Sequence, residues 1–265
     1  MGFKESSFSC EFHLIMEQEE INKFKVKAKK LRKDVLDLAL ETGGDGHLGG
    51  SFSEIEVLIA LYEKIMADDD KFILSKGHAC YPLYILLRER GYDPKISGHP
   101  DIDEANGICC TTGSLGHGLP IGVGMAMARK LLGKPGRIYV LMGDGEIQEG
   151  TTWESSLIAI RHKLDNLTVI IDHNKLQALE PLKNIISFDS LKDKFKEIGY
   201  DALEVDGHSF PEIIEAFKEK PKGKPQMVVA HTTKGKGVSY MENDPKWHGR
   251  KVISEEVKDA YKELE

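Results

Sequence analysis

Cysteine and tryptophan are scarce in this chain, and it has neither a long apolar run nor an excess of positive charge. Its 265 residues include four cysteines and two tryptophans. None of the cysteines has metal-motif spacing, and Cys109 and Cys110 are adjacent. This usage is typical of reduced thiols in a reducing, cytoplasmic compartment. No apolar stretch reaches the roughly 20 residues of a membrane helix. The first fifteen residues carry charges, so we expect no secretory signal and no membrane attachment.

The charge balance excludes a general nucleic-acid-binding surface. Lysine and arginine number 36 against 43 aspartates and glutamates, which gives a net charge of −7. An anionic ligand must therefore be met by local cations and backbone amides, and we expect no nucleic-acid partner. The length suffices for a sizeable core. Because no repeat or linker interrupts the chain, we expect a leader over residues 1–16 and a single domain over 17–265.

The first half of the chain is predicted to be mainly helical around one short strand. Apolar residues recur at helical spacing from Glu17 to Leu40, and Ser53 is expected to cap a second helix. The expected elements are helices over 17–40, 54–66, 75–90 and 116–132, a strand over 72–74, and a loop-rich stretch over 91–114.

The second half alternates between strand-like and helix-like segments. Strands are expected over 138–142, 167–171, 202–205 and 226–231, and helices over 151–163, 190–198 and 211–219. That alternation predicts an α/β fold, a doubly wound and mainly parallel sheet with flanking helices and right-handed crossovers.

Polar residues follow two of these strands at the points where the strands end. Gly143-Asp144-Gly145 closes the first, and Asn174 follows the second thirty residues later. The carboxyl ends of adjacent parallel strands meet at one edge of a sheet, where open α/β sheets bind ligands. A carboxylate and an amide oxygen there suit Mg²⁺ that also carries phosphate oxygens. The two glycines permit a sharp turn that exposes amide donors to phosphate.

The chain resembles the transketolase family in six ordered motifs. The segment GDGEIQEGTTWE with DHNKLQ is similar to the family's version of the thiamine diphosphate motif. The other five segments are GHLGG at 46–50, LSKGHAC at 74–80, GHP at 98–100, TGSLGHG at 112–118, and HTTKGKG at 231–237 followed by WHG at 247–249. The resemblance implies the thiamine-diphosphate-binding fold, in its diphosphate-binding module.

The same resemblance implies a cofactor site and a set of histidines. Mg²⁺ would be held by Asp144, Asn174 and the backbone carbonyl of Leu176, and would bridge the two phosphates of thiamine diphosphate. The cofactor-binding residues would be His78, Gly113, Ser114, Leu115, Gly143, Asp144, Gly145, Glu146, Asn174 and His248. The catalytic residues would be His47, His78, His99 and His248, which would move hydroxyl protons and stabilise a developing alkoxide near neutral pH.

Several other residues keep alternative interpretations. Glu149 is a family position that indicates a supporting group or one at a subunit contact. His117 and His231 could support the site or the fold, and Lys234 and Lys236 could close over the diphosphate or lie in a solvated loop. His13, His162, His173 and His208 match no site motif and are interpreted as surface or structural residues.

Departures from the family indicate a divided enzyme. Leu48 and Ser114 stand where proline is usual. Full transketolases are more than twice as long, and the glutamate that activates the cofactor and the arginines that hold the sugar phosphate lie in the part this chain lacks. We therefore expect the N-terminal subunit of a split transketolase. Its C-terminal partner would carry the pyrimidine-binding domain in an α2β2 heterotetramer.

The implied reaction is transfer of a two-carbon ketol unit from a ketose phosphate to an aldose phosphate, as in the pentose phosphate pathway. Three alternatives within this scaffold stay open: a split enzyme for a branched or sulfonated sugar, a 1-deoxyxylulose-phosphate-synthase-like enzyme, and a non-catalytic partner-binding subunit. An NAD-binding domain is disfavoured, because no GxGxxG follows the first strand.

Overall fold

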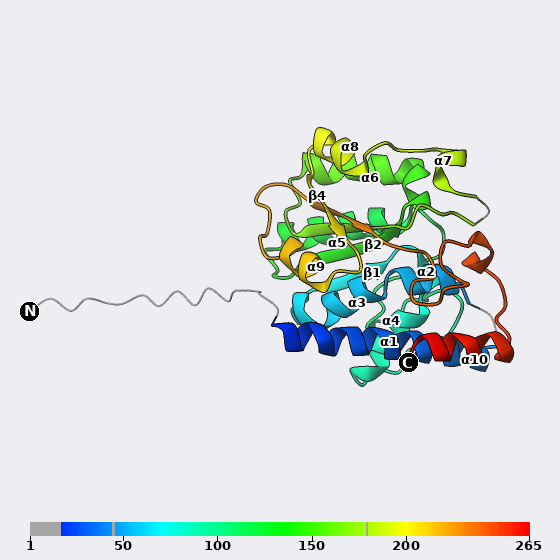
Figure 1. Ribbon diagram of the computed structural model, residues 1–265. Coiled ribbons are helices and arrows are strands. Elements are labelled where there is room, and N and C mark those ends of the chain that lie inside the picture. The colour runs from blue at the N-terminus through cyan, green and yellow to red at the C-terminus, as the bar shows by residue number, and fades with distance from the viewer. Residues whose placement is uncertain (1–16, 44–45, 179) are drawn as a thin grey trace, which may run out of the picture.

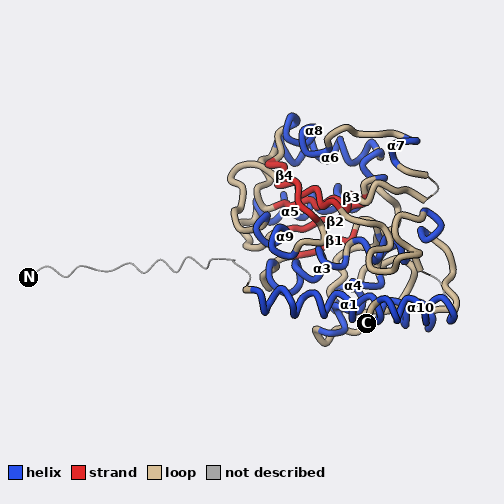
Figure 2. Tube along the Cα trace, in the orientation of Figure 1, coloured by secondary structure: helices blue, strands red, loops and turns tan. Residues whose placement is uncertain are grey.

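Five strands form one parallel sheet in the order β1-β2-β3-β5-β4. The computed structural model describes residues 17–43, 46–178 and 180–265, so the expected leader over 1–16 lies outside the described residues. The strands are β1 Lys71–Leu74, β2 Ile138–Gly143, β3 Leu167–His173, β4 Asp201–Asp206 and β5 Gln226–His231. They lie at the centre of the molecule with helices around them (Figure 2). The predicted parallel α/β architecture is confirmed, and each predicted strand is present.

Both faces of the central strands β2, β3 and β5 are buried, which explains their largely apolar sequences. In β2, Ile138, Val140 and Met142 pack into one hydrophobic cluster. Tyr139 and Leu141, which point the other way, pack into a second. The residues of β2 therefore meet an apolar layer on either face, whereas the edge strand β4 has exposed acidic residues at Asp201, Glu204 and Asp206.

The helices form two layers, one on each side of the sheet (Figure 1). Side chains of the first layer join the cluster that contains Val140, and those of the second join the cluster that contains Tyr139. The first layer contains α5 Gly118–Leu131, α6 Gly150–Arg161 and α8 Leu191–Ile198. The second contains α1 Gln18–Glu41, α2 Leu48–Ser53, α3 Ile55–Ala60, α4 Tyr81–Glu89, α9 Phe210–Ala216 and α10 Ser254–Glu263, the last beside α1.

The expected cap at Ser53 is wrong. Helix α2 begins at Leu48 and contains Ser53 as its last residue, and all six of its residues are buried. Its small residues allow a close approach: a Cβ on Gly49 would lie 2.9 Å from the backbone oxygen of Trp247. The second predicted helix continues as α3 and a π-helical turn over Leu61–Ile65.

Three further helices differ from the expectation. Helix α4 begins only at Tyr81, after a 3₁₀ turn over Gly77–Ala79. Helix α10 and the short α7, Leu182–Ile185, were not expected. Within the described ranges, no helix is both long enough and apolar enough to cross a bilayer.

Candidate functional site

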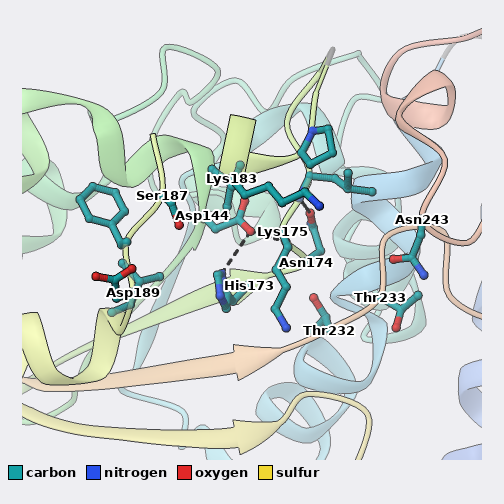
Figure 3. Close-up of a pocket in the computed structure, with 15 residues that line it drawn as sticks. Asp144, His173, Asn174, Lys175, Lys183, Ser187, Asp189, Thr232, Thr233 and Asn243 are labelled. Atoms are coloured by element: carbon teal, nitrogen blue, oxygen red, sulfur yellow. Dashed lines mark hydrogen bonds and ion pairs between the residues drawn. The ribbon is translucent and has the colours of Figure 1, made fainter. Parts of the chain in front are cut away.

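Asp144 and Asn174 lie together at the carboxyl edge of the sheet. Strands β2 and β3 pair in parallel with Gly143 opposite Asp172, so the residues that follow each strand emerge side by side. Both side chains are buried, and Figure 3 shows them next to each other. The Asp144 carboxylate accepts hydrogen bonds from the backbone N–H of Gly145 at 2.8 Å and of Lys175 at 2.6 Å. The predicted convergence is therefore present.

Three residues that carry a carboxylate, an amide or a backbone carbonyl oxygen line one cavity of about 210 Å³ at this edge. The lining includes Asp144, Asn174 and Leu176, together with Gly145 and His78. Among the described residues no cluster of three histidines, cysteines or carboxylates has metal-binding geometry. Because this donor set instead combines one carboxylate, one amide and one backbone carbonyl, it suits a hard cation such as Mg²⁺.

Gly145 allows the side chain of Gln177 to pack closely against the turn beside this oxygen set. A Cβ on Gly145 would lie 2.9 Å from Cγ of Gln177, which is closer than side chains tolerate. Gly145 also opens the 3₁₀ turn that follows Asp144, and its N–H belongs to that turn. The residues present therefore fit a metal-bound diphosphate through the oxygen donors of Asp144, Asn174 and Leu176.

Lys234 lies at the wall of the same cavity and is almost fully buried. Its ammonium donates to the carbonyls of Leu176 and Gln177, each at 3.3 Å, and lies 2.9 Å from Nδ1 of His248. Burial lowers the pKa of Lys234 to about 8, and the nearby charge of Lys76 acts in the same direction. The solvated-loop alternative for Lys234 is therefore wrong, whereas Lys236 is more exposed and pairs with Glu242.

The four predicted histidines gather beside the cavity. The ring centroid of His47 lies 5.0 Å from that of His78, 5.2 Å from that of His248 and 6.2 Å from that of His99. The rings of His78 and His248 are 5.1 Å apart. These residues come from four separate segments, namely the start of α2, the turn after β1, the loop before α5 and the turn over Pro245–His248. The fold therefore assembles the predicted cluster.

Three of these imidazoles are held in the neutral form. Burial lowers the pKa of His248 to about 3, with the charges of Lys234, His47 and Lys76 as further causes. Burial also lowers the pKa of His78 well below its ordinary value, and that of His47 to a lesser extent. Neutral imidazoles can accept hydroxyl protons, which is the role predicted for this cluster.

The remaining predicted cofactor residues occupy different positions. Leu115 lines the cavity, whereas Gly113 supports His99: its φ is +137°, and a Cβ there would lie 2.8 Å from that ring. Ser114 is exposed and lies 3.3 Å from the ring nitrogen Nδ1 of the exposed His117.

Glu146 lines the cavity but its oxygens are already bonded to the chain. One carboxylate oxygen accepts from the N–H of Gly116 at 2.7 Å and from the Ser75 hydroxyl. The other accepts from the N–H of Gly143 at 3.1 Å. Glu146 therefore braces the turn, while Glu149 is exposed at the cavity rim.

The sequence interpretation missed His173. Its Nδ1 lies 3.3 Å from the carboxylate of Asp144 (Figure 3). It borders a second cavity of about 780 Å³, which Lys175, Thr232 and Thr233 also line. Its position in the last residue of β3, one residue before Asn174, is the signal that could have identified it.

The depressed histidine pKa values predict acid sensitivity of the fold. Below about pH 6.5 the unfolded chain takes up protons that folded His47, His78 and His248 do not bind, so stability falls as pH decreases. We expect the melting temperature, measured by scanning calorimetry without cofactor, to fall between pH 7 and pH 5. The fall should be smaller in His248→Gln and unchanged in the exposed control His162→Gln. Equal falls in all three proteins would contradict the explanation.

Comparisons with known proteins agree with this geometry. Residues 25–265 match the family described as transketolase, thiamine diphosphate binding domain. An apulose-4-phosphate transketolase subunit of Actinobacillus succinogenes is 38% identical over 260 residues, which cover 90% of this chain and 94% of that protein. A 6-deoxy-6-sulfo-D-fructose transketolase subunit of Clostridium sp. (strain MSTE9) is 38% identical over 245 residues, with 84% and 89% covered.

Solved structures show the same fold in a longer chain. The transketolase from Leishmania mexicana superimposes with a TM-score of 0.82 at 26% identity. The match covers 91% of this chain and 40% of that one. The chain therefore spans less than half the length of a solved transketolase, and nearly the whole length of a relative whose name describes one subunit of a transketolase.

Proposed function

Because this chain belongs to the transketolase family and contains its thiamine diphosphate-binding domain, we propose that it is the cofactor-binding subunit of a two-subunit transketolase. The enzyme would transfer a two-carbon ketol unit from a ketose phosphate to an aldose phosphate. One observation carries the proposal: Asp144, Asn174 and Leu176 share a cavity with His78 and His248. We treat residues 17–265 as a single domain.

Asp144, Asn174 and the carbonyl of Leu176 would hold Mg²⁺, and the metal would hold the diphosphate. When bound, thiamine diphosphate supplies the electron sink that allows a carbon–carbon bond to break. Lys234 places a buried cation at the diphosphate end of the cavity.

The histidines would handle protons at the substrate end. His47 and His99 line a separate pocket next to the first cavity, together with Gly249. A neutral imidazole at His47 can accept a proton from a sugar hydroxyl, and the resulting imidazolium can stabilise a neighbouring oxyanion. His78 and His248 line the first cavity and contact the ring of His47, so they would orient both cofactor and substrate.

We propose that a second polypeptide completes the enzyme, with an α2β2 heterotetramer as the assembly. One observation supports a partner: the relative from Actinobacillus succinogenes, 94% of which is covered by the match, is named as one subunit of such an enzyme. Helices α5 and α6 pack together, and α6 exposes Leu157 and Ile158 while α5 exposes Ile121 and Leu131. Exposed apolar side chains on neighbouring helices are typical of a protein interface.

Substitution in this apolar helix pair should weaken the association of the two polypeptides. We expect Leu157→Asp to raise the dissociation constant of the pair by about tenfold or more, because a carboxylate would be buried at the contact. The matched control is Val26→Asp, since Val26 is similarly exposed but lies on α1 in the other helix layer. Sedimentation velocity over a concentration series measures both. Association that is unchanged in Leu157→Asp would place the interface elsewhere.

The relatives favour an unusual sugar as substrate. Their names contain apulose-4-phosphate and 6-deoxy-6-sulfo-D-fructose, at 38% identity, whereas human transketolase is 33% identical. We therefore propose a branched or sulfonated ketose ahead of the common substrates of the pentose phosphate pathway. The low cysteine count supports a cytoplasmic location.

The test is reconstitution of the chain with its partner. Ketol transfer would be measured on a panel of branched, sulfonated and common ketose phosphates with aldose phosphate acceptors, in the presence of Mg²⁺ and thiamine diphosphate. Transfer that requires both polypeptides and the cofactor supports the proposal. Cofactor binding without transfer on any ketose would instead favour a non-catalytic role for the chain.

A further inference from the structure

Beneath the metal-binding oxygens lies a fully buried carboxylate, Asp172, which does not itself line the cofactor cavity. It belongs to β3, two residues before Asn174, and none of its surface is exposed. It accepts hydrogen bonds from the Ser53 hydroxyl at 2.6 Å, from Nδ2 of Asn174 at 3.1 Å, from the Lys76 ammonium and from the Thr232 hydroxyl. A single side chain therefore connects β3 to three other segments and to a proposed metal ligand.

The charge of this carboxylate is balanced inside the protein. Lys76 is 2% exposed and lies between Asp172 and Glu54, with 2.9 Å from its ammonium to the Glu54 carboxylate. It also donates to the carbonyl of Gly50 at 2.8 Å. Because a buried ion needs a partner of opposite charge, Lys76 keeps Asp172 ionised and therefore able only to accept hydrogen bonds.

Because Asp172 can only accept hydrogen bonds, it determines the orientation of the side-chain amide of Asn174. The side chain of Asn174 ends in one oxygen and one NH₂ group of nearly equal size. In the orientation observed, the NH₂ donates to Asp172, while the oxygen accepts from the N–H of Leu176 at 3.1 Å. In the reversed orientation, an amide oxygen would face a carboxylate oxygen and an NH₂ would face an N–H donor. Both contacts would then be repulsive.

We propose that Asp172 is a positioning residue, which fixes the amide of Asn174 so that its oxygen is presented to the metal. The inference rests on the proposed function, in which Asn174 is a ligand of Mg²⁺. Removing a residue that hydrogen-bonds to a metal ligand and orients it commonly lowers the metal affinity by about 10–100-fold.

The first test replaces the carboxylate by an amide of the same shape. In Asp172→Asn the new side chain can present a donor as well as an acceptor, so the orientation of Asn174 is no longer fixed. Burial and the charge of Asp172 raise the pKa of Glu54 to about 8, so removing that charge favours an ionised Glu54 as the counter-ion of Lys76 and thus a folded protein. We expect the affinity of the full chain for Mg²⁺, measured by titration calorimetry with thiamine diphosphate present, to fall by about 10–100-fold. The matched control is Glu54→Gln, which alters the other carboxylate beside Lys76 and should change that affinity by less than about threefold.

A reciprocal exchange separates positioning from a general structural role. Asn174→Asp adds negative charge to the metal site, which alone would strengthen Mg²⁺ binding, but it also places two carboxylates 3.1 Å apart where a donor is needed. We expect weaker binding than in the wild type. The double variant D172N/N174D restores one donor facing one acceptor, so it should recover at least about tenfold of the affinity lost in D172N.

The outcomes distinguish a positioning role of Asp172 from a general structural role. Wild-type affinity in D172N, tighter binding in N174D, or no recovery in the double variant would overturn the positioning role. If D172N does not fold, as judged by circular dichroism, N174D still decides, because it leaves Asp172 and its partners intact. A wild-type chain that shows no Mg²⁺-dependent binding of thiamine diphosphate would contradict the proposed function itself.

Discussion

Replacing Asp144 by asparagine is expected to lower the affinity of the full chain for Mg²⁺ and thiamine diphosphate by on the order of 100-fold. Asp144 supplies the only carboxylate of the proposed ligand set, since Asn174 and Leu176 contribute neutral oxygens. Removing its charge leaves the metal with weaker electrostatic attraction and leaves the diphosphate held mainly by Lys234. Titration calorimetry of the cofactor at fixed Mg²⁺, and of Mg²⁺ at fixed cofactor, measures both losses.

The loss should be specific to binding. Asparagine has the same shape as aspartate, and its oxygen can still accept one of the two backbone hydrogen bonds now made by Asp144. The melting temperature without cofactor should therefore fall only modestly, because one backbone N–H loses its acceptor and the other keeps it. Asp189→Asn is the matched control, because Asp189 is an exposed acidic residue that lines the larger cavity next to Asp144. Affinity lost equally in both variants would mean that overall negative charge, and not the ligand set, attracts the metal.

The sheet and its carboxyl edge could be predicted from the sequence because their physical signals are local. The runs at 138–142 and 167–171 are apolar apart from Thr168, which is typical of strands covered on both faces. Parallel pairing then requires Asp144 and Asn174 to meet at one edge, and the structure confirms this. The histidine cluster was predicted only from the resemblance to transketolases, because its four members come from separate segments.

The errors occur where tertiary contacts override local signals. Ser53 was interpreted as a helix cap because serine precedes an apolar run, but burial of α2 against Trp247 moves the helix start to Leu48. Lys234 lies in a glycine-rich stretch that indicates a solvated loop, yet the loop folds back onto Gly49, whose carbonyl accepts from the N–H of Gly235 at 2.9 Å. Neither contact has a counterpart in the neighbouring sequence.

Helix α10 was missed for a different reason. Val257, Ala260 and Leu264 are buried at helical spacing, so a local signal exists. The segment is otherwise highly charged, so its few apolar residues give only a weak amphipathic pattern. His173 was missed because it matches no motif, although its place at the end of β3 brings its ring to Asp144.

The isolated chain is expected to show no measurable ketol transfer, even with saturating Mg²⁺ and thiamine diphosphate. Its described residues provide a diphosphate end, in Asp144 and Asn174, and a histidine cluster around His47. Among those residues, the cofactor cavity has carboxylates at Asp144, Glu146 and Glu149, all of which lie in or directly after the GDG turn. The acidic group that would activate the other end of the cofactor must then come from the proposed partner.

Adding that partner should raise the rate by several orders of magnitude, since a missing proton-transfer group alone costs about 10²–10⁴-fold. A coupled spectrophotometric assay of the aldose product, run with each polypeptide by itself and with both together, measures the gain. The control is the pair reconstituted with Asp144→Asn, which should stay inactive at limiting cofactor. Transfer by the highly purified single chain at a rate near that of the pair would show that one polypeptide holds the whole active site.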